Sequence, residues 1–543
     1  MHTVVADSTP QVRTDTVLHA LARALDRAPD TPFLSFESIQ YSFREVDELS
    51  TRFAHSLADL GVNRGQTVAT LLDNGIDQVV SWFAINKLGA IWVPLNTAYR
   101  GDFLEHQLSD SNSTILVCDD QYLPNVARVA GNLPYLQRIL CRGEYSDSSV
   151  GDIPIDLLDR YRGADTSPIP ITAAPGDLSL LIYTSGTTGP SKGCMVSHNY
   201  ICHQGQQTNQ SVPPLPGEVM YTCLPLFHIS AVDTLVSALL AQTCIAIAKK
   251  FSLSGFWSEI SQSGAANVRL LSSILPLVAQ AADTPEMQRC VGQIRAVTGY
   301  ATPEVVQVWK KWFGVQIFIA QSYGQSEGAR LSTTYAGTRE PPAGSCGQID
   351  TDAFDVVILD EDDNIVSDGE IGEIAYRPRK PHVMFDGYWR RPEETLKLWR
   401  NLWMHSGDLG KKEGDFLYFV DRKKDYLRSR GENISSFEIE RSFMKHSEIS
   451  EVVVHAISDG ISEDCLKVTA VLESNSAMTE RDLCLWSLNE VPYFAVPRFI
   501  EFRNTLPKTP TGKITKNTLR QEGLTPATWD RETSDIIVRR SRN

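Results

Sequence analysis

The sequence contains ten cysteines but no Cys-x-x-Cys pair, and the cysteines are scattered singly along the chain. This spacing is not typical of zinc knuckles or of a disulfide framework. No uncharged apolar stretch approaches the roughly 20 residues of a membrane span, and the N-terminus lacks the basic start and apolar run of a signal peptide. These absences predict a chain without an integral-membrane segment that resides in a reducing cytoplasm.

Basic residues are also fewer than acidic residues. Lys and Arg total 51 against 66 Asp and Glu, which gives a formal net charge of −15. Such a charge repels the phosphate backbones of nucleic acids and anionic bilayers, so nucleic acid is not an expected partner. An anionic ligand must then be held by local features, such as amide clusters, a metal ion or single lysines.

The chain does contain a regular succession of apolar strand patterns and amphipathic helix patterns. Residues 66–96 are typical of a strand, a helix and a strand, which predicts a βαβ unit, and residues 352–420 have the texture of an antiparallel section. From about residue 425 the pattern predicts a separate unit of roughly 120 residues. The predicted fold class is therefore α/β, with a large N-terminal body of mixed sheets packed with helices and a small α+β C-terminal domain.

One loop has an unusual composition: YTSGTTGPSKG, residues 183–193, follows an apolar strand. Its glycines allow tight turns that point N–H groups inward, while its hydroxyls and single lysine add donors and a positive charge. Such a loop suits a polyphosphate, although it lacks the Gly-Lys-Ser/Thr ending of a P-loop. On composition alone, an ordinary surface loop stays open as the alternative. The residues concerned are Thr184, Ser185, Gly186, Thr187, Thr188, Gly189 and Lys192.

With its companion segments, this loop closely resembles the signature of the adenylate-forming enzymes, the superfamily of acyl-CoA synthetases, peptide-synthetase adenylation domains and beetle luciferases. The sequence pattern of the C-terminal segments is similar to that of the branch of crotonobetaine and carnitine CoA ligases. The matching segments follow in order along nearly the whole chain: LPLFHIS (224–230), QSYGQSEG (321–328), GEI (372–374), WMHSGDLG (403–410), DRKKDYLRSRGENIS (421–435) and PKTPTGK (507–513).

The resemblance implies an ATP site and assigns roles within it. Glu327 is the expected Mg²⁺ ligand, with the Thr184 hydroxyl beside it, because Mg²⁺ takes hard oxygen ligands alongside phosphate oxygens. Asp408 would accept both ribose hydroxyls, and Arg422 would reach the same ribose or its phosphate. Tyr323 would stack on adenine. The other nucleotide contacts that the resemblance implies are Gly299, Tyr300, Ala301, Gln321, Ser322, Gly324, Gln325 and Ser326.

The resemblance gives Lys513 the central electrostatic role, which is to bridge the substrate carboxylate and the α-phosphate while negative charge builds up. It divides the chain into an AMP-binding N-terminal domain, 1–423, and a mobile C-terminal domain, 424–543, that delivers Lys513. The hinge would be Lys424. After the domain turns, three residues would contact coenzyme A: Arg430, Gly431 and Glu432.

The acid pocket is expected around Phe227, His228 and Tyr300. Relatives that activate amino acids carry Phe-Asp where this chain has Phe227-His228, so the partner of a substrate ammonium is absent and a simple carboxylic acid is favoured. Tyr300 replaces a small residue of relatives and would shorten the pocket or offer a hydrogen bond. A quaternary ammonium would need an aromatic cage, which the sequence does not identify.

The function that the resemblance implies is an ATP-dependent acid–thiol ligase, which forms an acyl adenylate, transfers the acyl group to coenzyme A and releases AMP and pyrophosphate. It implies ATP, Mg²⁺ and coenzyme A as cofactors and co-substrates, and since relatives often form dimers, a homodimer is compatible with it. Three alternatives stay open: an acyl-AMP ligase that loads a carrier protein, a luciferase-like oxygenase and a non-catalytic nucleotide sensor. The implied catalytic residues are Lys513, Glu327, His228 and Lys192.

Overall fold

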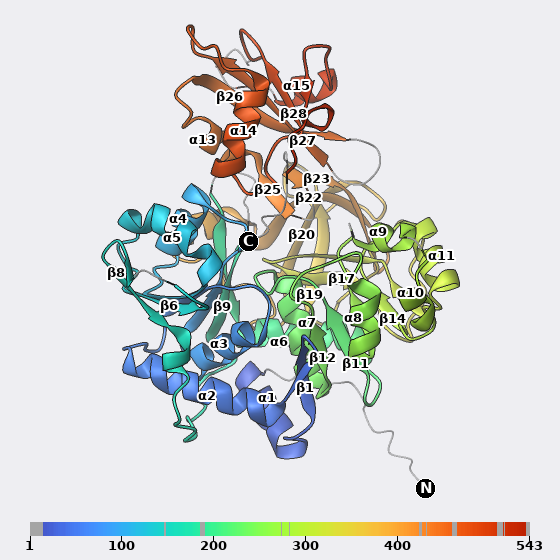
Figure 1. Ribbon diagram of the computed structural model, residues 1–543. Coiled ribbons are helices and arrows are strands. Elements are labelled where there is room, and N and C mark those ends of the chain that lie inside the picture. Colours follow the sequence, from blue (N-terminus) through green and yellow to red (C-terminus); the bar gives the residue numbers. More distant parts are fainter. Residues whose placement is uncertain are drawn as a thin grey trace.

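The computed structural model describes residues 15–145, 148–184, 190–272, 274–281, 283–422, 426–429, 432–458, 464–507, 514 and 516–538. For 421–422, 426–429, 432–435, 437–438, 458, 464 and 517 only the backbone is described. Figure 1 shows a large body with a smaller C-terminal domain seated above it. No helix in these ranges combines the length and the apolar character needed to cross a bilayer.

An eight-stranded sheet forms the first part of the body and leads into the predicted phosphate loop. Its central strands run parallel and an antiparallel strand lies at each edge, in the order β10-β9-β4-β3-β5-β6-β8-β7. The predicted βαβ unit is confirmed, because β3 and β4 pair in parallel and α3 connects them. The strands are β3 (Thr67–Leu71), β4 (Ile91–Pro94), β5 (Ile115–Asp119), β6 (Arg138–Arg142), β7 (Ser149–Val150), β8 (Ile153–Leu157), β9 (Leu178–Thr184) and β10 (Lys192–Ser197).

A seven-stranded sheet forms the middle of the body in the order β15-β14-β13-β11-β12-β1-β2, parallel except for the β1–β2 hairpin. Thr222, Arg269, Thr298 and Ile319 stand in register on four neighbouring strands. The loops after these strands therefore leave the same edge of the sheet, which is where parallel sheets place ligands. The strands are β1 (Pro32–Phe36), β2 (Ile39–Ser42), β11 (Val219–Thr222), β12 (Ile245–Ile247), β13 (Ala265–Arg269), β14 (Ala296–Thr298) and β15 (Ile317–Ile319).

A third, antiparallel sheet completes the body in the order β16-β17-β18-β23-β22-β20-β19, with β21 paired to β22. The predicted antiparallel section over 352–420 is confirmed, but the sheet begins earlier, at Ser322, because the polar stretch SYGQ has no apolar alternation to predict a strand. The strands are β16 (Ser322–Gln325), β17 (Ala329–Thr333), β18 (Gln348–Ile349), β19 (Phe354–Leu359), β20 (Gly372–Pro378), β21 (Trp399–Arg400), β22 (Trp403–Glu413) and β23 (Phe416–Arg422).

The C-terminal part has the predicted α+β character. A two-stranded ladder of β24 (Tyr426–Ser429) and β25 (Glu432–Ser435) precedes a four-stranded sheet in the order β26-β27-β28-β29. The sheet strands are β26 (Ile449–Ser458), β27 (Asp464–Leu472), β28 (Phe499–Phe502) and β29 (Trp529–Asp530), and the helices are α13 (Ser436–Phe443), α14 (Glu480–Glu490) and α15 (Lys516–Glu522).

Helices pack around the sheets of the body, and the largest hydrophobic cluster joins residues from all three of these sheets. All ten cysteines are free thiols. The helices of the body are α1 (Val17–Arg27), α2 (Phe43–Asp59), α3 (Ile76–Lys87), α4 (Gly101–Asp110), α5 (Leu123–Val129), α6 (His198–Ser211), α7 (Ile229–Ala241), α8 (Phe256–Ser263), α9 (Ile274–Gln280), α10 (Pro285–Arg289), α11 (Pro303–Trp312) and α12 (Pro392–Lys397).

Candidate active site

The strands β9 and β10 hold the two ends of the predicted phosphate loop next to each other. Thr184 closes β9, Lys192 opens β10, and the two residues are direct partners in the antiparallel register. Ser185, Gly186, Thr187, Thr188 and Gly189 lie between them, outside the described residues. A hydroxyl and an ammonium are thus fixed at the mouth of the loop.

Glu327 faces this mouth from the turn of the β16–β17 hairpin. Its Oε1 accepts hydrogen bonds from Thr184 Oγ1 at 3.2 Å and from the Tyr388 hydroxyl at 2.9 Å. Burial, followed by the Glu327 charge, raises the pKa of Tyr388 well above its ordinary value, so Tyr388 keeps its proton and remains a donor. The carboxylate and the Thr184 hydroxyl form the hard-oxygen set that the sequence predicted for Mg²⁺.

Tyr388 was not predicted from the sequence. Its segment pairs with β10: the Trp389 N–H donates to Gly193 O at 2.7 Å, and the Met195 N–H donates to Gly387 O at 2.9 Å. These backbone bonds fix the phenol relative to the phosphate loop. The only local signal was the run GYWRRPEE, in which a glycine–tyrosine pair precedes a helix that starts with proline and two acids.

Lys192 is held by a second group that the sequence did not reveal. Its Nζ lies 2.8 Å from Glu394 Oε2 and 5.1 Å from the centroid of the Tyr388 ring, and its side chain is only 13% exposed. Glu394 also accepts a hydrogen bond from Arg391 Nη1 at 2.9 Å. Burial acts to raise the pKa of Glu394, but hydrogen bonds from Lys192 and Arg391 outweigh it and hold that pKa below its ordinary value.

Asp408 lies on β22, directly opposite Arg422 of β23. The carboxylate is buried, and its Oδ2 accepts hydrogen bonds from the Tyr323 hydroxyl at 2.7 Å and from Gln325 Nε2 at 2.9 Å. The Tyr323 ring stacks on Phe419, with centroids 6.2 Å apart. The structure therefore brings the predicted ribose acid, the predicted adenine contact and the backbone of the predicted arginine to one place; the Arg422 side chain lies outside the description.

The predicted nucleotide contacts after β14 and β15 lie at the same edge of the middle sheet. A Cβ on Gly299 would meet Leu270 O at 2.5 Å, so only glycine fits there. A Cβ on Gly324 would meet Ala329 O at 2.3 Å across the hairpin. The other predicted contacts of these loops and of the hairpin turn, Ala301, Gln321, Ser322 and Ser326, lie beside these two glycines in the chain.

The residues of the predicted acid pocket differ in their exposure to solvent. The Phe227 ring is buried and lies 4.7 Å from the His228 ring, centroid to centroid, and His228 is the residue at the N-terminal end of α7. Tyr300 is 70% exposed. Its contribution to the pocket stays a prediction. Lys513, Lys424, Arg430 and Gly431 lie outside the described residues, as does the side chain of Glu432.

Comparisons with known proteins point to one enzyme family. Residues 21–389 match the family model described as AMP-binding enzyme, and residues 438–513 match its C-terminal domain. A long-chain-fatty-acid–CoA ligase of Escherichia coli O157:H7 is 28% identical, over 94% of this chain and 95% of its own. A crotonobetaine/carnitine–CoA ligase of Salmonella paratyphi A is also 28% identical, over 90% of this chain and 96% of its own.

Solved structures share the fold at lower identity. An o-succinylbenzoate CoA synthetase from Bacillus subtilis superposes with a TM-score of 0.79 at 22% identity, covering 94% of this chain and 99% of that one. An anthranilate CoA ligase in complex with anthranoyl-AMP gives a TM-score of 0.70 at 23% identity, with 94% and 97% covered. The matches to the two family models together span most of the sequence, and the chain belongs to the AMP-binding enzyme family of the adenylate-forming superfamily.

Proposed function

We propose that this enzyme activates a carboxylic acid with MgATP and transfers the acyl group to coenzyme A. The observation that supports this most directly is the convergence of Thr184, Lys192 and Glu327 at the mouth of the phosphate loop, with Asp408 opposite Arg422 on the neighbouring sheet. Both relatives described above are named CoA ligases. The chain needs no covalent nucleophile for this reaction, because it positions and neutralises the reactants.

In the first step a carboxylate oxygen of the acid attacks the α-phosphorus of ATP. The bond from this phosphorus to the bridging oxygen breaks, pyrophosphate leaves, and an acyl adenylate remains. Residues 184–189 and Lys192 would hold the departing phosphates, and Asp408 would fix the ribose. Magnesium bound with ATP would be held by Glu327 and Thr184 and would neutralise phosphate charge.

In the second step the C-terminal domain would turn about Lys424 and exchange Lys513 for the surface of residues 430–432. The sulfur of coenzyme A attacks the carbonyl carbon of the adenylate, the bond to the phosphate oxygen breaks, AMP leaves and the thiol proton passes to solvent. One site would thus serve two reactions through two arrangements of the domains.

Two assays on the purified enzyme test this function. Acid-dependent exchange of pyrophosphate into ATP without coenzyme A tests adenylation, and consumption of coenzyme A in equal amount to AMP tests the acceptor. Lys513→Ala should abolish adenylation yet leave thioester formation from a supplied acyl adenylate largely intact, whereas Lys310→Ala, on the exposed face of α11, serves as the matched control. AMP release without coenzyme A consumption would favour a carrier protein as acceptor. No acid-dependent AMP release with any acid would exclude the proposal.

A further inference from the structure

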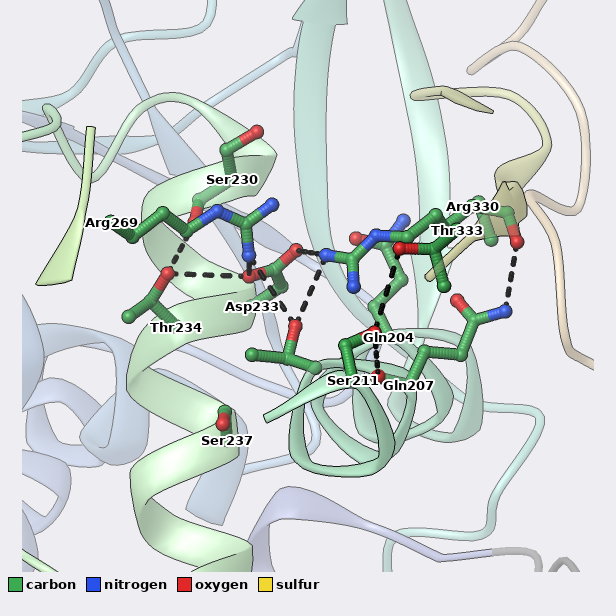
Figure 2. A network of polar contacts seen from close by, with 12 residues as sticks. Gln204, Gln207, Ser211, Ser230, Asp233, Thr234, Ser237, Arg269, Arg330 and Thr333 are labelled. Carbon is green, nitrogen blue, oxygen red and sulfur yellow. Dashed lines mark hydrogen bonds and ion pairs between the residues drawn. The ribbon is translucent and has the colours of Figure 1, made fainter. Parts of the chain in front are cut away.

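A buried charge network joins the elements α6, α7, β13 and β17. Figure 2 shows Arg269 and Arg330 approaching Asp233 from opposite sides. Arg269 Nη1 donates to Asp233 Oδ1, Arg330 Nη2 lies 3.2 Å from Asp233 Oδ2, and both arginines reach Thr208 Oγ1, at 3.4 Å and 3.1 Å. The side chains of Arg269, Arg330 and Asp233 are 15%, 8% and 2% exposed. This is a site with two cations and one anion, almost entirely withdrawn from water.

The backbone places the network next to three groups of predicted site residues. Asp233 lies on α7, which begins directly after His228. Arg269 ends β13 and stands in register with Thr298, the residue before Gly299. Arg330 is the direct partner of Gly324 in the β16–β17 hairpin. Each of the three elements therefore carries a predicted acid or nucleotide contact, so the network lies on elements that build the predicted site.

The arginines have more donors than the described network uses. A guanidinium carries five N–H donors on three nitrogens. Within the described residues, the side-chain hydrogen bonds of Arg269 all leave from Nη1 and those of Arg330 all leave from Nη2. The other guanidinium nitrogens have no partner among these described contacts, so their donors are available to a ligand.

The positive charge is not balanced by the other carboxylate of this region. Asp350 accepts a hydrogen bond from Gln207 Nε2 at 2.8 Å and lies 3.7 Å from His203 Nε2, and it forms no ion pair with either arginine among the described contacts. Burial lowers the pKa of Arg269 to about 10, against the opposing effect of Asp233 and with a further lowering by Arg330. An unmatched buried cation is costly, so an oxyanion beside it would be stabilised.

We propose that the acid substrate is a dicarboxylic acid, whose reacting carboxylate meets ATP while its second carboxylate binds Arg269 and Arg330. This deepens the proposed function and rests on it. A methyl chain end would leave the arginine donors unpaired, and a quaternary ammonium would be repelled. The network thus favours a substrate class different from those in the names of the fatty-acid and crotonobetaine ligases that the chain resembles.

The wild-type enzyme tests this with matched acids. Dicarboxylic acids across a series of chain lengths are compared, by acid-dependent AMP release, with their monomethyl esters, with monocarboxylic acids of equal length and with a betaine acid. At the preferred length we expect kcat/KM for the dicarboxylic acid to exceed that of its ester by about ten- to a hundredfold, as for a hydrogen bond to a charged group. Equal or better use of the ester, the methyl-ended acid or the betaine at every length would overturn the substrate proposal alone. No AMP release with any acid would instead overturn the proposed function.

Variants of the arginines separate binding from packing. Arg330→Gln and Arg269→Gln should lower kcat/KM for the dicarboxylic acid by about ten- to a hundredfold while leaving that for the ester nearly unchanged. Arg295→Gln is the matched control, because Arg295 pairs with Glu218 at 2.7 Å at the opposite edge of the same sheet, and it should not alter the ratio. An equal fall for both acids would show that the arginines only support packing. If the glutamine variants do not fold, the substrate proposal is still tested by the wild-type acid panel and by Arg330→Lys, which keeps the positive charge.

Discussion

At the scale of single residues, Glu327 and Lys192 are each held by a partner that belongs to the segment 386–397. Tyr388 donates to the Glu327 carboxylate, and Glu394 pairs with the Lys192 ammonium. The two residues expected to meet opposite charges, a metal ion and phosphate, are therefore fixed by neighbouring positions of one segment. Substituting Tyr388 or Glu394 alone therefore tests the contribution of each partner separately.

Removal of the Tyr388 hydroxyl should weaken the magnesium dependence of adenylation. Tyr388→Phe deletes one hydrogen bond to a carboxylate, worth about 1.5–3 kcal/mol, so the magnesium concentration for half-maximal pyrophosphate exchange should rise about tenfold or more. The measurement is a magnesium titration at fixed ATP. Tyr135→Phe, at a residue that is 44% exposed, is the control. An unchanged titration would show that Tyr388 does not position Glu327.

Removing the charge of Glu394 should strengthen ATP binding, whereas removing the Tyr388 hydroxyl should weaken the response to magnesium. Phosphate must take Lys192 from Glu394 on binding, so Glu394→Gln should lower the KM for ATP by about two- to fivefold, the size of a modest ion pair. The control is Glu393→Gln, at the exposed neighbouring position. A raised KM would mean that Glu394 orients Lys192 for phosphate and does not compete with it.

At the scale of elements, the sequence predicted those parts of the fold whose signal is local. The strand–helix–strand unit over 66–96 was predicted because each apolar run is buried as a whole, as in any parallel sheet. The hairpin β16–β17 was not, because its position depends on distant groups: the Tyr200 hydroxyl donates to Ser326 O at 2.8 Å and accepts from the Ala329 N–H at 3.0 Å. Motif resemblance therefore identified Glu327, while Tyr388 and Glu394 required the structure.

The helix α6 carries a pH-sensitive group at its first position. Burial lowers the pKa of His198 from its ordinary value of 6.5 to about 4, so the folded chain keeps it neutral. As the pH falls below 6.5, His198 becomes protonated in the unfolded state, whereas in the folded state it stays neutral down to about pH 4. The free energy of unfolding therefore decreases between pH 6.5 and pH 4. The loss from His198 should be about 3 kcal/mol.

Chemical denaturation across this pH range checks that expectation. The free energy of unfolding of the wild type should fall from pH 6.5 toward pH 4, and His198→Gln should show a shallower fall whatever its absolute stability. The buried His203 and His455 act in the same direction, so the variant should reduce the slope without abolishing it. Identical slopes for the two proteins would contradict a buried neutral His198.

At the scale of the whole molecule, the C-terminal domain contacts the body through α4. Phe103 of α4 is 6% exposed and belongs to the hydrophobic cluster of the C-terminal domain, and the Tyr99 and Phe494 rings lie 6.2 Å apart. Asp102 pairs with Lys445 beside this contact. This contact could not be predicted from the sequence, because Phe103 has the pattern of an ordinary core residue of a helix.

This contact should bias the domain motion of the proposed reaction. Phe103→Ala removes a buried ring from an interface present in one arrangement of the domains, so that arrangement should lose about 3–5 kcal/mol relative to any arrangement without it. Small-angle scattering should then show a larger radius of gyration, and the rates of adenylation and of thioester formation from a supplied adenylate should change by unequal factors. Leu485→Ala, which shortens an exposed apolar side chain of α14, is the control. Unchanged scattering together with equal factors for both half-reactions would mean that the α4 contact persists through the whole cycle. The domains would then have to exchange Lys513 and residues 430–432 by a movement that leaves the α4 contact intact.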